Sequence, residues 1–259
     1  MTAMTSCEFK LMHYGEEDGH RRTLEIKRYD RLQCRYLTTG DFSALQQMNT
    51  EYAVETRMLI EDVLRLGVVN DPAINSKMLK YYQDSTLQAI VMDVEARYAD
   101  MSDVAEELDG AFLRMKKHFP RLPIPEIYTQ IGALDQSVVV GDDAIGICLD
   151  KYLGEDYPLY AKYYTKEQRK VMKREMIAAD CLVFYIISVF PLDGYDLRSK
   201  PVRDRHAAKV MWVVNSLLGK KVFDTPLVDD VEAYAKHHPG ATYTDILRAD
   251  NVKSGRIHE

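Results

Sequence analysis

The sequence predicts a predominantly helical α+β fold in a single domain with a small antiparallel sheet. Over most of the chain, apolar residues recur every three or four positions, which is typical of helices with one buried face. Short runs rich in β-branched residues, separated by Gly and Asp, are concentrated between residues 126 and 150. With 259 residues, 46% of them hydrophobic, the chain is long enough to bury one core without metals or disulfides.

The N-terminal half begins with a polar, charged segment, residues 1–22, that shows no periodicity and is expected to be a flexible lead. Alternation over residues 24–30 then predicts a strand with one buried face. Helical spacing follows over residues 42–66 and, after an Asp-Pro turn, over residues 78–82. One or two more helices are expected over residues 87–118, and the group of prolines that follows ends this helical region.

The middle of the chain predicts the sheet. Residues 126–131, 137–140 and 145–150 are expected to form three short strands joined by turns that contain Gly and Asp. Because these runs follow one another closely, an antiparallel meander is the expected arrangement.

The next helix is predicted to be the central buried one. Thr165 and Gln168 have the spacing of a capping box, and the residues that follow are nearly all apolar as far as Val189. The helices expected beyond it span residues 203–218, which Gly219 ends, and two short segments after Pro226 and Thr242.

The charge and hydropathy of the chain exclude two classes of protein. The formal net charge is -6 and the sequence pI is near 5.7, without a concentrated basic run, so nucleic acid is not an expected partner. The most apolar stretch, residues 178–191, contains Asp180 and is shorter than the ~20 apolar residues that a membrane span needs.

None of the four cysteines is part of a Cys-x-x-Cys pair, which argues against a zinc knuckle or a redox centre. Cys148 and Cys181 lie in apolar surroundings typical of buried, inert thiols, and Cys34 completes an odd set of three if Cys7 is modified. Met4-Thr5-Ser6-Cys7 has the pattern that ends a bacterial lipoprotein signal, in which the cysteine receives lipid. If it is such a signal, the precursor starts upstream of Met1.

The sequence contains no nucleophile elbow, Walker loop or dinucleotide fingerprint, and no cofactor is expected. A helix that follows a small sheet is where zincin metalloproteases carry His-Glu-x-x-His. Here Glu175 has the position of the general base, but Arg174 and Ala178 occupy the two ligand positions. The sequence therefore predicts no metal site and, at most, a degenerate zincin-like one.

A polar site formed by Asp150, Tyr152, Glu175 and Asp180 is the remaining candidate for chemistry. Two neighbouring carboxylates could serve as acid and base. The structural interpretation is favoured: Glu175 pairs with a basic neighbour, and Asp180 binds backbone groups or Tyr hydroxyls. The basic residues that could pair with Glu175 are Lys151, Lys173 and Arg174.

Residues 149–154, Leu-Asp-Lys-Tyr-Leu-Gly, resemble without a gap the Leu-Asp-x-Tyr-Leu-Gly turn of the GldB family of gliding-motility lipoproteins. Residues 24–30 are similar to the family's early strand, which ends in a basic-aromatic-acidic triplet, and the resemblance extends over residues 24–220. The family usually continues into a longer C-terminal region, so the chain resembles a C-terminally divergent member.

The resemblance implies a non-enzymatic lipoprotein of the cell envelope, anchored in the outer membrane by acyl chains such as palmitate on Cys7 and facing the periplasm or the surface. Residues 1–22 would then be the tether and residues 23–259 one GldB-like domain. The expected partners are the membrane, through the lipid, and other envelope proteins of gliding motility or secretion, for which the chain would be a scaffold or accessory subunit.

Two alternatives remain open. The first is a degenerate zincin-like hydrolase that uses Glu175, Asp180 or Asp150. The second is a glycan-uptake accessory protein in which tyrosines between residues 152 and 164 provide stacking platforms, although packing is the favoured role for these rings.

Overall fold

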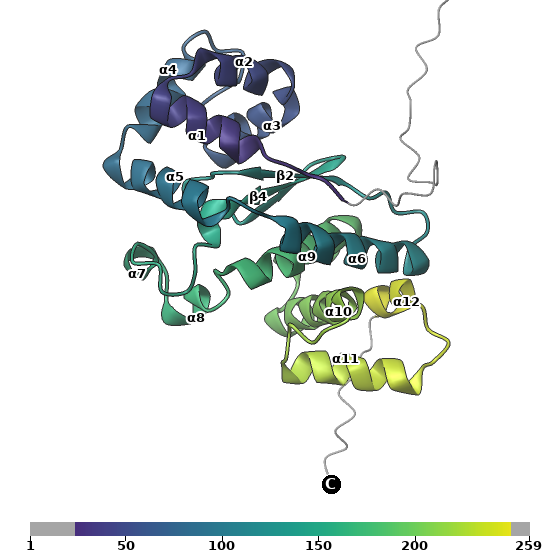
Figure 1. The fold of residues 1–259 in the computed structure, drawn as a ribbon. Coiled ribbons are helices and arrows are strands. Elements are labelled where there is room, and N and C mark those ends of the chain that lie inside the picture. Colours follow the sequence, from purple (N-terminus) through teal and green to yellow (C-terminus); the bar gives the residue numbers. More distant parts are fainter. Residues whose placement is uncertain (1–23, 250–259) are drawn as a thin grey trace, which may run out of the picture.

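The computed structural model describes residues 24–249, which form a helix-rich α+β domain around a four-stranded mixed sheet (Figure 1). Helices near the N-terminus cover one face of the sheet, and α6 (Ser102–His118) and α9 (Ile177–Val189) lie on its other side. The predicted fold class, helical α+β, is confirmed. Residues 1–22, which the sequence predicts to be a lead, and the last ten residues lie outside the described part.

The sheet has the order β1-β2-β4-β3 and is not the antiparallel meander that the sequence predicts. The hairpin of β3 (Val138–Val140) and β4 (Ala144–Cys148) is antiparallel as expected, but β2 (Glu126–Gln130) pairs with β4 in parallel. The loop after β2 carries the chain past β4 to the edge of the sheet before the hairpin begins. Spacing along the sequence does not reveal such a crossing.

The N-terminal strand is shorter than predicted. β1 comprises only Ile26–Lys27, which pair in parallel with β2, and α1 (Tyr29–Thr39) begins within the stretch expected to be extended. The sequence did not reveal this helix because its buried face includes the polar residues Asp30 and Gln33. Gly40, at φ 69°, ends α1 in the left-handed conformation that glycine adopts without strain.

The remaining helices of the N-terminal half follow the predicted periodicity, but they are broken into shorter units. The expected helix over residues 42–66 consists of two α-helices followed by a π-helical turn, and the expected 87–118 block consists of α5 and α6. The elements are α2 (Phe42–Thr50), α3 (Ala53–Met58), the π-turn η1 (Leu59–Val63), α4 (Ile74–Tyr82) and α5 (Ser85–Arg97).

The central buried helix, α9, begins twelve residues later than the predicted N-cap. Thr165 and Gln168 do form a capping box, but it opens only the short α8 (Lys166–Arg169). Lys173 then bridges Leu153 in an extended conformation, and this tertiary pairing interrupts the helix. The short elements around this break are η2 (Leu149–Lys151), α7 (Tyr160–Tyr163) and η3 (Arg174–Met176).

The C-terminal helices match the predictions closely and pack below α6 and α9 (Figure 1). The predicted stop at Gly219 is present as a left-handed cap, and the helix expected after Thr242 begins with a capping box that was not predicted. After the short turn η4 (Tyr195–Leu197), the elements are α10 (Lys200–Leu218), α11 (Pro226–His237) and α12 (Tyr243–Arg248).

Candidate functional site

The turn over residues 149–154 is organised by Asp150, which is fully buried directly after β4. Its two carboxylate oxygens accept hydrogen bonds from the backbone amides of Gly132, at 2.6 Å, and Leu134, at 2.5 Å. Burial raises the pKa of the Asp150 carboxyl, and the two amide donors oppose that rise. Asp150 therefore holds the loop that leads from β2 to β3.

That loop has an unusual backbone. Ala133 and Leu134 both have positive φ values, 54° and 67°, a region that residues with a Cβ rarely adopt. Such a conformation persists only where the surroundings hold it in place. Here the Asp150 carboxylate binds the amides on both sides of Ala133, which supplies that restraint.

The tyrosines that follow turn their hydroxyls inward. Tyr160 donates to the backbone oxygen of Asp150 and accepts from the amide of Leu153 at 2.9 Å. Tyr164 donates to the backbone oxygen of Leu134, and the Lys151 ammonium lies 4.2 Å from the centroid of its ring. These contacts give Tyr160 and Tyr164 the packing role that was favoured over stacking.

Tyr152 and Asp180 form the most distinctive polar pair of the predicted site. The Tyr152 hydroxyl donates to Asp180 Oδ2 at 2.8 Å, joining the residue after η2 to the first turn of α9. Burial raises the pKa of Asp180 to about 6, against an ordinary value of 3.8, and the hydrogen bond from Tyr152 opposes the rise. The expectation that Asp180 binds backbone groups or Tyr hydroxyls is confirmed by this contact with Tyr152.

Glu175 does not join this pair. Its side chain is exposed on the short turn η3 before α9, and within residues 24–249 it forms no ion pair with Lys151, Lys173 or Arg174, so the predicted basic partner is not found. Its neighbour Arg174 forms a bidentate ion pair with the Asp103 carboxylate, with nitrogen–oxygen distances of 2.8 and 2.6 Å. The structure thus brings Tyr152 and Asp180 together and leaves Glu175 outside.

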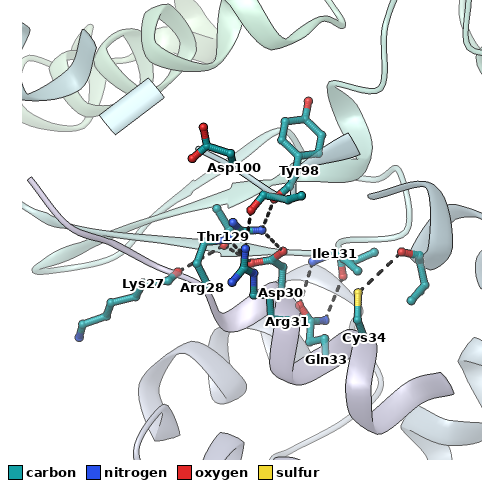
Figure 2. Close-up of polar contacts among 12 residues, drawn as sticks. Lys27, Arg28, Asp30, Arg31, Gln33, Cys34, Tyr98, Asp100, Thr129 and Ile131 are labelled. Atoms are coloured by element: carbon teal, nitrogen blue, oxygen red, sulfur yellow. Dashed lines mark hydrogen bonds and ion pairs between the residues drawn. The ribbon is translucent and has the colours of Figure 1, made fainter. Parts of the chain in front are cut away.

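A second polar centre was not recognised from the sequence as a site, although two of its residues belong to the triplet that ends the early strand. Arg28 donates to both oxygens of the fully buried Asp30, at 2.9 and 2.8 Å, and to the backbone oxygen of Tyr98 at 2.6 Å (Figure 2). Thr129 of β2 donates to the same carboxylate. The available signal was an Arg and an Asp two residues apart at the end of a predicted strand.

The chain also resembles a known family over most of its length. A family model described as gliding motility protein GldB matches residues 16–204. The chain belongs to the GldB family. Comparison with curated proteins and with solved structures found no match. The GldB family is not a known enzyme family, and membership links the chain to gliding motility.

The match places both polar centres of this GldB-family chain inside the family region. Asp150 and the Arg28–Asp30 pair each connect segments that are distant in the sequence. Their contacts give them a structural role in positioning the sheet, its loops and the helices around it.

The cysteines of the described part, Cys34, Cys148 and Cys181, are all free and buried, as predicted for Cys148 and Cys181. Burial raises the pKa of each thiol, which disfavours the reactive thiolate. Cys7, the predicted lipidation residue, lies outside the described residues. Between residues 24 and 249, no three His, Cys, Asp or Glu side chains are grouped as a metal would need.

None of the helices between residues 24 and 249 is long and apolar enough to cross a membrane.

Proposed function

We propose that this GldB-family protein is an outer-membrane lipoprotein, anchored by acyl chains at Cys7, that acts as a non-enzymatic scaffold or accessory subunit. Its partners would be envelope proteins of gliding motility or secretion. The observation that carries the proposal is the family match over residues 16–204. The lipobox-like Met4-Thr5-Ser6-Cys7 lies just upstream of that match and supports the anchor.

The arrangement of the chain suits such an anchor. The charged segment between Cys7 and the start of the domain near residue 23 would keep the fold away from the lipid surface. A second acyl chain makes membrane attachment stable, so the folded part needs no hydrophobic anchor of its own.

The contacts of the ionisable groups support a structural role for them. Asp150 is held by two amides, and Arg174 is paired with Asp103. Glu175, the residue on which a zincin-like hydrolase would depend, is exposed and separate from the other carboxylates of the predicted site. No observation favours the hydrolase, so the scaffold is the function we propose.

The anchor is tested by Cys7→Ala in the full-length precursor expressed in its native envelope. The wild-type protein should fractionate with membranes, whereas the variant should move to the soluble fraction because it has no acylated sulfur. Ser6→Ala is the matched control, since a small residue before the cysteine is retained, and it should stay with membranes. Mass spectrometry of the N-terminal peptide should show the acyl groups, and unchanged membrane retention of Cys7→Ala would contradict anchoring there.

The scaffold role is tested with the same membrane-bound protein, tagged at its C-terminus and solubilised in mild detergent. Envelope proteins of the gliding or secretion machinery should co-purify in fixed ratio. Zinc measured at one ion per chain, together with a hydrolytic activity lost in Glu175→Gln, would overturn the scaffold in favour of the hydrolase.

A further inference from the structure

A surface groove runs between α5 and the segment over residues 157–162. It consists of two hollows of about 290 and 510 Å³, both lined by Asp93, Tyr157 and Pro158. The two hollows therefore adjoin at these residues, and their volumes lie near the lower end of the range of small-ligand sites. The Asp150 and Arg28–Asp30 centres do not contribute to its lining.

Tyr157 forms an aromatic wall that is held from two sides. Its hydroxyl donates to Asp93 Oδ2 at 2.7 Å, and its ring packs edge to face on Tyr160 at a centroid distance of 5.0 Å. Tyr160 is hydrogen-bonded to the backbone oxygen of Asp150, so the packing on Tyr160 holds the Tyr157 ring against the turn over residues 149–154. A wall that is fixed before a ligand arrives loses little conformational entropy on binding.

Arg97 is positioned in the groove by the last residue of the same turn. Gly154 has a φ of 108°, and a Cβ built on it would lie 2.9 Å from Arg97 Nη1. Glycine therefore provides both the backbone conformation and the space that the guanidinium occupies. Arg97 is exposed, and within residues 24–249 no carboxylate forms an ion pair with it.

The lining combines three kinds of group. Asp93 is an acceptor, Arg97 and the exposed Lys162 are donors, and the Thr86 side chain can act as either. The Tyr157 ring and Pro158 add apolar surface. A sugar ring has the matching pattern, with hydroxyls that donate and accept around its edge and apolar C–H groups on its faces.

We infer that this groove is a binding site for a neutral oligosaccharide. Asp93 lines each hollow together with a single cation, Lys162 in the first and Arg97 in the second, so neither hollow is strongly charged and a neutral ligand suits the site. The open shape fits a short stretch of a longer glycan chain. The inference is independent of the proposed scaffold role and of the lipid anchor.

The test is isothermal titration of the full chain with three probes: maltohexaose, cellohexaose and the N-acetylglucosamine hexamer. At least one should bind with a Kd below about 1 mM. Tyr157→Ala should weaken binding at least about tenfold, Arg97→Ala at least about fivefold, and Tyr157→Phe, which keeps the ring, less than about threefold. Tyr163→Ala is the control, because that ring is 65% exposed and does not line the groove, and it should not change binding.

Two results would overturn the site. One is that no probe binds at millimolar concentration, and the other is that a probe binds equally well to Arg97→Ala and Tyr157→Ala. Circular dichroism and the Tm check that each variant is folded. If Tyr157→Ala fails to fold, Arg97→Ala decides, because its side chain is exposed. An unstructured neutral peptide that binds in preference to all three sugars would also refute the saccharide assignment.

Discussion

At the scale of single residues, the groups that looked suited to acid–base chemistry have separate surroundings. Asp150 is fully buried, and each of its carboxylate oxygens accepts a hydrogen bond from a backbone amide, whereas Glu175 is exposed. Asp180 lies between these extremes, with one hydrogen bond from Tyr152 and a pKa raised to about 6 by burial. Its ionisation is therefore the one most open to measurement by changing the pH.

Asp180 should make the folded state less stable as the pH rises. Its pKa is about 6 in the fold and 3.8 as a model value, so between these values the native state binds more protons than the unfolded chain. The contribution is favourable below pH 4 and is lost progressively as the pH passes 6, by up to about 3 kcal/mol. Asp180→Asn cannot ionise and should become more stable relative to wild type over the same range.

Urea unfolding of both proteins at several pH values between 4 and 8 measures this difference. Asn retains an oxygen that can accept the Tyr152 hydroxyl, so the comparison isolates the charge. Asp103→Asn is a useful contrast, because Arg174 lowers the pKa of Asp103: its stability difference from wild type should stay nearly constant from pH 8 down to about 5 and decrease only as the pH approaches 4. A stability difference between Asp180→Asn and wild type that does not vary with pH would contradict the assignment.

At the scale of elements, the parallel pairing of β2 and β4 depends on a close contact across the strands. Tyr128 lies opposite Gly146, and a Cβ built on Gly146 would lie 2.5 Å from the Tyr128 ring. The ring is buried, so it cannot move into solvent to make room. Gly146 thus allows the aromatic side chain to fit between the strand and the helices.

Gly146→Ala should destabilise the protein by about 1–3 kcal/mol, because the added methyl overpacks a filled core. Gly240→Ala is the control, since that position has no heavy atom within 4 Å and no positive φ, and its stability should be unchanged or slightly higher. Thermal unfolding followed by circular dichroism compares them. Equal Tm values for the two variants would show that the Tyr128 ring does not need the space that Gly146 leaves.

At the scale of the whole molecule, the Arg28–Asp30 pair joins segments that are distant in the sequence. It connects the start of α1 with Thr129 in β2 and with the backbone at the end of α5 (Figure 2). On the same helix, Gln33 bonds both backbone groups of Ile131 after β2. These polar contacts attach the N-terminal helices to the sheet.

Asp30→Asn should lower the free energy of unfolding by about 3 kcal/mol, because it leaves a largely buried guanidinium without its counter-charge. Asp204→Asn, whose pair with Lys200 is solvent-exposed, should have little effect. Urea unfolding measures both, and a similar small change in the two variants would mean that the buried pair adds nothing to the attachment.

Part of the candidate site could be predicted from the sequence, and part could not. Asp180 was expected to bind backbone groups or Tyr hydroxyls, and it accepts the hydroxyl of Tyr152. Glu175 was grouped with it because the two are close along the chain, but the turn before α9 directs Glu175 to solvent. The Arg28–Asp30 centre depends on a partner about 100 residues away, Thr129, which no local pattern indicates.

The sequence by itself determined the features that depend on near neighbours: the helical α+β class, the capping box at Thr165, the helix after Thr242 and the glycine that ends α10. The tertiary structure alone decided the mixed strand order, the late start of α9 and the groove beside Tyr157. Propensity and capping act over a few residues. Strand partners, buried ion pairs and grooves are set by contacts between distant segments, which a local pattern does not encode.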